Sequence, residues 1–352
     1  MKNLHLILFF FLSTFFCNAQ KIIFLHHSTG GGVYNEGNVA KWFQNYNNQN
    51  GTAYNIIERS YPNTPYPWEN YPYDFWNLWI NGACNNNSPA VECMDKITQN
   101  FDVIIFKHCY PGADVLADQG NASVGSKRKS LENYKLQYRA LRTLMDSYPN
   151  NKFIVWTLAP LHQNATTVEN ASRARQFVEW VKNEWLTEDQ KSYPNIYVFD
   201  FFGLAAELST SPINGKPNCL KYLYEGSHSG SDSHPNSLAN KTIGSQFAQF
   251  VVDAIKNPSS ALKDIKKDEP LIFIYPNPAK DMITIDCSNN LRTLNGYTIK
   301  VANSMGQIIY ESQVYHQTTS IELHGRNGKG VYFIHLIDKD SNSITVKKII
   351  LQ

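Results

Sequence analysis

The stretch KIIFLHHSTGGG, residues 21–32, decides the fold of the first part of the chain. A near-continuous apolar run ends in two histidines, which are followed by Ser28, Thr29 and three glycines. An apolar run without polar alternation is typical of a parallel strand that is buried on both faces of a sheet. The residues that follow it then lie at the carboxyl end of the strand, where ligands bind in open α/β sheets. We therefore expect a site here, with Ser28 as the residue that the strand presents.

The same pattern repeats along the chain as far as about residue 255. Short apolar runs predict strands at Ile22–His26, Tyr54–Arg59, Val103–Lys107, Phe153–Leu158 and Ile196–Phe201. Apolar residues at helical spacing predict helices at Val39–Tyr46, Leu131–Tyr148, Ala171–Trp185 and Asn236–Ile255. Strands separated by helices indicate an α/β domain with a doubly wound parallel sheet. We assign residues 20–256 to this domain.

The N-terminus, residues 1–19, has the anatomy of a secretory signal peptide, with a lysine, an apolar block and a small residue before Gln20. A membrane-spanning helix needs about 20 apolar residues. Because the apolar block is shorter than that, we expect no membrane span. The net charge of +2 at pH 7 gives no indication of a nucleic-acid partner. Export also makes disulfides possible. Cys84 and Cys93 are the first candidate pair and Cys109 and Cys219 the second, although spacing does not fix the connectivity.

The character of the chain changes near residue 256. Residues 257–271 are polar, rich in lysine and bounded by prolines, which is typical of a linker. After them, short alternating strands separated by turn signals predict a small β-sandwich over residues 272–352. Its pieces YPNPAKDMITI, VANSMGQIIY and GVYFIHLIDKDSNSITVKKIILQ occur in this order up to the last residue.

These three pieces resemble the C-terminal sorting domain of type nine secretion cargo. The resemblance implies the type nine secretion machinery as a partner, and a protein that is secreted or held at the cell surface of a gram-negative bacterium. A sugar-binding β-sandwich appended to an enzyme is the alternative for this segment.

A serine nucleophile needs a base, and a candidate lies far downstream of Ser28. His234 stands in GSDSHPN, immediately before the dipeptide that opens the last predicted helix. Asp232 is the nearest carboxylate and can orient the imidazole as in a catalytic triad. The competing interpretations are local: a glycine turn with a capping serine, a phosphate-binding loop, and a helix cap at DSHPN.

The three glycines after Ser28 favour a tight turn with positive φ. In such a turn, backbone N–H groups near Ser28 and Gly30 can face a developing oxyanion. Lys107 and His108, which follow the third predicted strand, are further candidates for the oxyanion or the substrate.

Ser28 after the first strand and His234 before the last helix resemble the SGNH (GDSL-like) hydrolase family in layout. The resemblance implies a three-layer, flavodoxin-like fold without a cofactor, in which Ser28 is the nucleophile, His234 the base and Asp232 the third member. The motifs are partial, because His26-His27-Ser28 stands where the family has Gly-Asp-Ser, and Ser231 stands where it has its aspartate. Two other carboxylates stay open as the third member: Asp200 and Glu225. The asparagine donor of the family is also absent after the third strand.

Consecutive strand residues point to opposite faces, so we expect one of His26 and His27 near Ser28 and the other in the core. We include His27 among the substrate contacts. A metal would need further ligands such as those at His108, His162, His228 or Asp200, and no metal-binding spacing supports one. We therefore expect neither metal nor cofactor.

Residues 59–79, RSYPNTPYPWENYPYDFWNLW, are rich in proline and aromatic residues and follow the second strand. They suit a carbohydrate cleft, and a self-packed lid is the alternative. His162 and Gln163 follow the fourth strand as possible substrate contacts. Together these features favour a secreted serine hydrolase that cleaves acyl esters on carbohydrate. The rivals are a noncatalytic carbohydrate-binding or surface protein on the same scaffold and a metal-assisted hydrolase.

Overall fold

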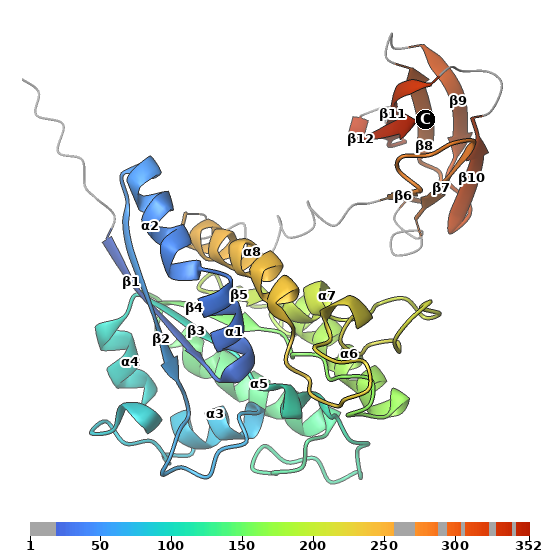
Figure 1. The fold of residues 1–352 in the computed structure, drawn as a ribbon. Helices are drawn as coiled ribbons and strands as arrows, with labels where there is room; N and C mark the ends of the chain where they lie inside the picture. Colours follow the sequence, from blue (N-terminus) through green and yellow to red (C-terminus); the bar gives the residue numbers. More distant parts are fainter. Residues whose placement is uncertain (1–18, 257–271, 288–293, 304–306, 324–328, 340–342) are drawn as a thin grey trace, which may run out of the picture. The chain divides into compact units, whose positions relative to one another are not determined.

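The computed structural model describes residues 19–256, 272–287, 294–303, 307–323, 329–339 and 343–352 (Figure 1). The predicted signal peptide, apart from Ala19, and the predicted linker at 257–271 lie outside the described residues. The chain divides into two compact units, residues 1–262 and 263–352.

The first unit contains a sheet of five parallel strands in the order β2-β1-β3-β4-β5. The strands are β1 (Ala19–His26), β2 (Ala53–Ser60), β3 (Val103–Phe106), β4 (Lys152–Trp156) and β5 (Ile196–Phe199). The parallel α/β sheet predicted from the apolar runs is confirmed. Residues that alternate along each strand, such as Phe24 and Leu25, contribute to two different cores, one on each face of the sheet.

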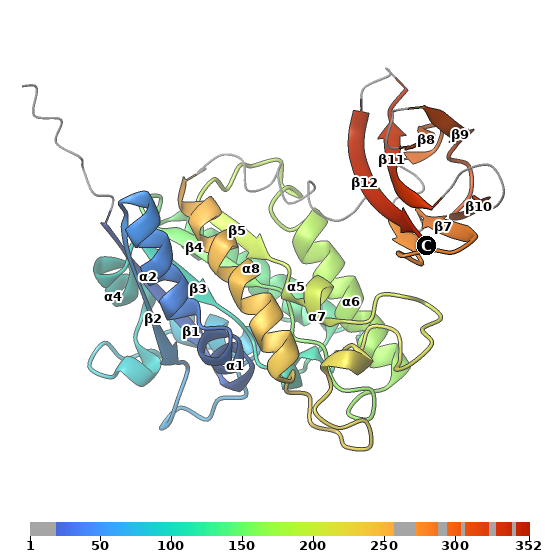
Figure 2. The same ribbon diagram turned by 45° about the horizontal axis from the view of Figure 1, so that its top comes forward.

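Helices cover both faces of this sheet, which gives three layers (Figures 1 and 2). One face carries α1 (Ser28–Glu36), α2 (Val39–Asn50), α7 (Phe201–Ala205) and α8 (Ser237–Lys256). The other face carries α3 (Pro72–Trp79), α4 (Met94–Asn100), α5 (Leu131–Asp146) and α6 (Val168–Asn183). Three short 3-10 turns, η1 (Pro89–Val91), η2 (Tyr110–Ala113) and η3 (Tyr222–Tyr224), lie in the connections. In the part of the chain that the structure describes, we find no helix of the length and apolarity that a bilayer crossing needs.

The glycine run after Ser28 is helical, so the predicted turn with positive φ is wrong. Its glycines are required by close packing instead. A Cβ added at Gly30 would lie 2.5 Å from Cβ of His26, and one at Gly32 would lie 2.8 Å from Nδ2 of Asn240. Glycine disfavours a helix interior by roughly 1 kcal/mol relative to alanine. The tight contact of α1 with β1 and α8 offsets this cost.

The cysteine predictions are half right. Cys84 and Cys93 form a disulfide, as predicted. The second candidate pair is wrong, because Cys109 and Cys219 are separate buried thiols in the described part of the chain. Cys109 lies at the carboxyl edge of the sheet, directly after β3 and Lys107-His108.

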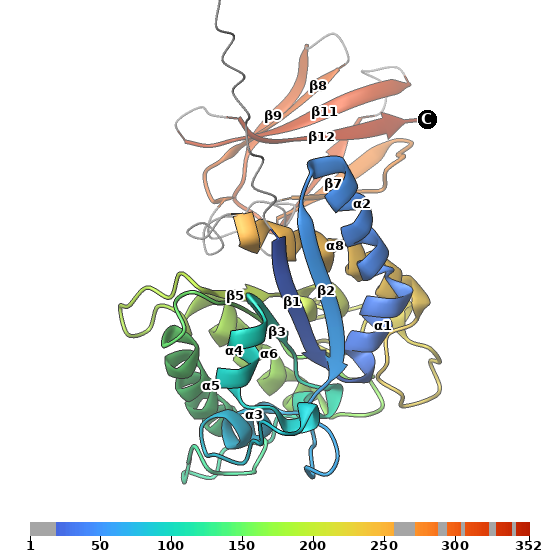
Figure 3. The ribbon, with the colours of Figure 1, turned by 90° about the vertical axis from the view of Figure 1, so that its left-hand side faces the viewer.

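The second unit is an antiparallel β-sandwich (Figure 3). One sheet has the order β10-β7-β6, formed by β6 (Phe273–Tyr275), β7 (Met282–Asp286) and β10 (Thr318–Glu322). The other has the order β12-β11-β8-β9, formed by β8 (Thr298–Asn303), β9 (Ile308–Gln313), β11 (Gly330–Ile337) and β12 (Ser343–Leu351). Residues of both sheets, such as Ile283 and Ile334, share one core, and this confirms the predicted antiparallel sandwich.

Candidate functional site

The strand order places a topological switch point between β1 and β3. β1 leads into α1 and α2 on one face of the sheet, whereas the chain after β3 leads into α5 on the other. In sheets of this order, the connections diverge at the switch point and leave a crevice outside the carboxyl ends of the two strands, where ligands bind. Ser28 follows β1 and Cys109 follows β3, and Ser28 Oγ lies 3.4 Å from Cys109 Sγ. Ser28 is therefore at the position in the fold where a ligand is expected.

Ser28 is the first residue of α1 and its side chain is exposed. The first N–H groups of any helix lack partners within the helix, and here the N-cap residue His27 supplies no side-chain cap. The N–H groups of Ser28 and Thr29, in the first turn, thus have no partner within the helix. The N–H of Gly30 donates to the carbonyl of His27 at 2.7 Å. This corrects the prediction of Gly30 as an oxyanion donor.

His234 forms a close pair with Asp232 in the loop before α8. Asp232 Oδ1 lies 2.5 Å from His234 Nδ1 and accepts the backbone N–H of His234 at 3.1 Å. Burial acts to raise the pKa of Asp232, but these hydrogen bonds outweigh it and leave the pKa lowered. The aspartate thus stays ionised and fixes the imidazole by Nδ1, which leaves Nε2 for other partners.

Two contacts connect this pair and its loop to residues near Ser28 in the fold, Tyr110 and Gly32. The His234 ring meets the Tyr110 ring edge-on, with 4.9 Å between centroids. Ser28 and His234 therefore contact the consecutive residues Cys109 and Tyr110. Asn240 of α8 makes the second connection, because it packs against Gly32 of α1 while its Nδ2 donates to the carbonyl of Pro235 at 3.2 Å.

The two alternative carboxylates bond to other groups. Asp200 caps α7, where Oδ1 accepts the N–H of Gly203 at 2.9 Å, and its Oδ2 pairs with Lys182. The Glu225 carboxylate is buried and lies between two other histidines, 3.3 Å from His162 Nε2 and 2.8 Å from His228 Nδ1. Of the three candidate carboxylates, only Asp232 bonds to His234 in the described residues.

His162 is fully buried, so the prediction that it contacts substrate is wrong. It anchors the loop of His234 instead. Its backbone N–H donates to Ser233 Oγ at 2.8 Å, and its Nε2 lies 3.0 Å from the carbonyl oxygen of Ser227. Ser233, the residue next to His234, is thereby tied to the loop that follows β4.

Lys107 and His108 are both fully buried behind the site. His108 lies among core aromatics, with Nε2 2.8 Å from the Tyr138 hydroxyl and Nδ1 without a hydrogen-bond partner among the described residues. Because the side chain has no exposed surface, neither nitrogen is accessible to a ligand, and the prediction that His108 serves the oxyanion is wrong. Burial lowers its pKa to about 3, with a further contribution from Lys107. The Lys107 ammonium has no hydrogen-bond partner among the described residues. Burial lowers its pKa to about 8, and its interaction with Cys109 acts in the opposite direction.

The two neighbouring histidines have different surroundings, as the strand geometry predicts. His26 packs under α1, and its Nε2 lies 2.8 Å from Glu58 Oε2. His27 stacks on the indole of Trp68, with 3.6 Å between ring centroids, and its Nε2 lies 2.5 Å from the carbonyl oxygen of Pro62. Burial lowers the pKa of His27 to about 4, so its ring is neutral at pH 7. His27 therefore supports an aromatic platform beside Ser28.

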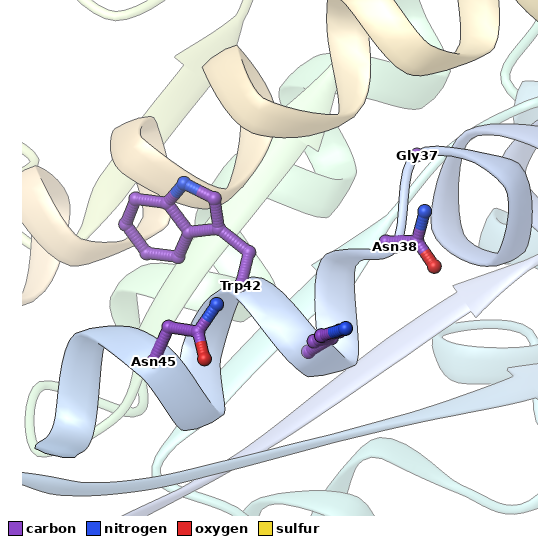
Figure 4. Close-up of a pocket in the computed structure, with 5 residues that line it drawn as sticks. Gly37, Asn38, Trp42 and Asn45 are labelled. Carbon is purple, nitrogen blue, oxygen red and sulfur yellow. The ribbon is translucent and has the colours of Figure 1, made fainter.

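Two further observations bear on ligands. No group of three His, Cys, Asp or Glu side chains suited to a metal occurs in the described residues. A surface hollow of about 230 Å³ at the α1–α2 connection is lined by Gly37, Asn38, Lys41, Trp42 and Asn45 (Figure 4). These residues differ from those around Ser28.

Comparison with known proteins identifies the second unit. Residues 273–352 match the family model of the secretion system C-terminal sorting domain. This segment is a type nine secretion sorting domain. The protein is accordingly secreted or held at the cell surface, as predicted from the three motifs.

The other similar proteins either match a short part of this chain or match it at low sequence identity. An endo-acting ulvan lyase of Formosa agariphila is 33% identical over 95 residues, which are 26% of this chain and 18% of that protein. The chain thus spans less than a fifth of the curated relative. PorZ, a surface component of the type nine secretion system of Porphyromonas gingivalis, is 19% identical over 26% of this chain and 12% of its own, with a TM-score of 0.20. A carbohydrate esterase with catalytic and non-catalytic binding functions is 11% identical over 66% of this chain and 68% of its own, with a TM-score of 0.32. Likenesses at these TM-scores say nothing of this chain's activity.

Proposed function

We propose that residues 20–256 form an SGNH-type serine hydrolase that cleaves acyl esters on carbohydrate outside the cell. The observation that supports the proposal is that Ser28 contacts Cys109 while His234, paired with Asp232, contacts the next residue, Tyr110, beside the switch point of the sheet. Crevices of this kind hold the ligands of doubly wound folds.

In the proposed mechanism, Ser28 Oγ attacks the ester carbonyl while His234 Nε2 removes its proton. The tetrahedral intermediate collapses when the imidazolium returns this proton to the leaving alcohol. Water then attacks the acyl-enzyme with His234 again as base, and this releases the carboxylic acid and restores Ser28. Asp232 accepts the Nδ1–H of His234, orients the ring and stabilises its charged form.

The oxyanion is proposed to bind at the N-terminus of α1. The N–H groups of Ser28 and Thr29 lack helical partners there, and the helix dipole favours negative charge at this end. The buried Lys107 ammonium adds positive charge behind Cys109. This arrangement replaces the asparagine donor that the SGNH resemblance leads one to expect, because preorganised donors and charges stabilise an oxyanion whatever residue supplies them.

The carbohydrate part of the proposal rests on the aromatic residues next to Ser28, since Trp68 and His27 stack there. Aromatic faces bind the apolar faces of sugar rings while leaving sugar hydroxyls in water. The name of the ulvan lyase relative is compatible with a carbohydrate substrate.

The proposal is tested with the full chain and p-nitrophenyl acetate. We expect wild type to hydrolyse it and to be labelled at Ser28 by a fluorophosphonate, as read by peptide mass spectrometry, and Ser28→Ala to do neither. Equal slow turnover by both proteins would instead favour a noncatalytic carbohydrate-binding protein. Loss of activity with a chelator and its return with a divalent ion would favour the metal-assisted hydrolase.

A further inference from the structure

One aromatic side chain, Trp68, lies beside the candidate nucleophile. Its indole stacks on the ring of His27, with 3.6 Å between centroids and 17° between planes. His27 directly precedes Ser28 in the chain and is the N-cap residue of α1. Trp68 is also partly exposed, so a partly accessible indole contacts the residue that precedes Ser28.

The loop that carries Trp68 is held in place at its base. Asn70 Nδ2 donates to the carbonyl of Tyr61 at 2.9 Å, which closes the loop. The Asn70 carbonyl accepts the N–H of Cys109 at 2.8 Å, and the N–H of Glu69 donates to Asp74 Oδ2 at 2.9 Å. The loop is therefore tied to the same residue, Cys109, that contacts Ser28. Such bracing fixes the indole relative to the hydroxyl and lowers the entropy cost of ligand binding.

Four of the other aromatic side chains of residues 59–79 are not available to a ligand. Tyr61, Tyr71, Phe75 and Trp79 are buried in the core on the α3 side of the sheet. The self-packed interpretation of this segment therefore holds for these four residues. It does not hold for Trp68, whose contact is with His27 at the site and not with that core.

We infer that Trp68 forms a sugar-ring subsite of the hydrolase and holds the sugar that carries the ester; this inference rests on the proposed function. His27 covers one face of the indole, and its neutral ring adds no charge that would disfavour the apolar face of a sugar. The sugar ring stacks on the remaining indole surface. Its acyl group then extends toward Ser28, at the first turn of α1.

The experiment compares the hydrolysis of a peracetylated methyl glucoside with that of p-nitrophenyl acetate, which has no sugar. The variants are Trp68→Ala, Trp68→Phe and the matched control Trp42→Ala. Trp42 is also partly exposed and stacked, on Tyr46 in α2, among residues distinct from those around Ser28. The measured quantity is the ratio of kcat/KM for the glucoside to kcat/KM for p-nitrophenyl acetate.

We expect Trp68→Ala to lower this ratio by about 3- to 10-fold through KM, since an aromatic stack contributes roughly that factor. Trp68→Phe should recover part of the ratio and Trp42→Ala should leave it at the wild-type value. An equal loss on both substrates would overturn the subsite, since Trp68 would then only support His27 and Ser28. So would a ratio that stays at the wild-type value in Trp68→Ala.

A binding measurement separates this inference from the proposed function. Ser28→Ala and the double variant Ser28→Ala/Trp68→Ala are titrated with the unesterified methyl glucoside by calorimetry, which needs no turnover. Weaker binding by the double variant supports the subsite even if wild type proves to lack esterase activity. Equal binding by the two variants overturns the subsite and leaves the hydrolase proposal standing.

Discussion

Ser28 Oγ lies 3.4 Å from Cys109 Sγ, although the two residues are 81 positions apart in the chain. The contact joins the ends of two neighbouring parallel strands and places a thiol against the candidate nucleophile. Cys109 is buried, and so are the other described free cysteines, Cys219 and Cys287. Because the Cys109 thiol contacts Ser28 Oγ, its modification should interfere with a reaction at Ser28.

We expect methyl methanethiosulfonate to inhibit ester hydrolysis by modifying Cys109. The added group occupies the space next to Ser28 Oγ, where an ester carbonyl has to approach. Hydrolysis of p-nitrophenyl acetate before and after treatment measures the effect. Cys219→Ala, which removes a thiol that burial makes less acidic, is the matched control and should be inhibited like wild type. If Cys109→Ala is inhibited as strongly as wild type, the relevant thiol is another one.

The assignment of the third catalytic residue makes a second prediction. Asp232 bonds to His234, whereas Asp200 caps α7. We expect His234→Ala to lower kcat by about 10²- to 10⁴-fold, the usual contribution of a positioned acid–base residue. Asp232→Asn should lower kcat because the amide no longer stabilises the imidazolium. Asp200→Asn is the matched carboxylate control, and a larger loss in this variant than in Asp232→Asn would refute the assignment.

Much of the first unit was predictable because apolar runs and helical periodicity report burial directly. The five strands and the helices α2, α5, α6 and α8 follow from these patterns. The helix α1 does not, since three consecutive glycines disfavour a helix in isolation. Only the folded chain shows that Gly30 and Gly32 let α1 approach His26 and Asn240. Tertiary packing thus overrides local propensity at the residues that follow Ser28.

The sequence predicts those residues of the candidate site that stand directly after a strand or directly before a helix. Ser28 and the His234–Asp232 pair come from strand and helix ends, whose positions the pattern fixes. The exposure of individual side chains does not follow from the pattern. His108 and His162 come after strands like Ser28 does, but both are buried. The sequence predicts Cys109 as half of a disulfide because cysteines in an exported chain commonly pair, whereas in the structure it is a buried free thiol.

The buried histidines predict a loss of stability in acid. Burial lowers the pKa of His27 to about 4 and that of His108 to about 3, whereas an unfolded histidine titrates near 6.5. Between these values the unfolded state binds more protons, so stability falls as the pH decreases from about 6.5 toward 4. The expected loss between pH 6.5 and 4.5 is on the order of 2 kcal/mol for each histidine.

Urea unfolding followed by tryptophan fluorescence tests this, because all seven tryptophans lie in the first unit. His108→Gln removes one of the two groups and should show a smaller decrease between pH 6.5 and 4.5 than wild type. The comparison uses the change with pH, so a general destabilisation by the substitution does not affect it. Equal decreases in the two proteins would mean that His108 does not take up a proton on unfolding.

The last prediction concerns the buried ammonium of Lys107, because removing its charge should raise the stability of the protein and lower its activity. Its pKa of about 8 lies well below the ordinary lysine value of about 10.4, so the folded state disfavours the charge. Lys107→Met replaces it with an apolar side chain of similar length, and we expect the free energy of unfolding to rise by about 1–3 kcal/mol near pH 7. Wild type should also gain stability between pH 8 and 10.5, where the unfolded state binds the additional proton, and the variant should lack this gain.

If the charge stabilises the oxyanion, the more stable variant will have a lower kcat for p-nitrophenyl acetate. A variant that is more stable and equally active would restrict Lys107 to a structural role and leave the N-terminus of α1 as the proposed oxyanion site.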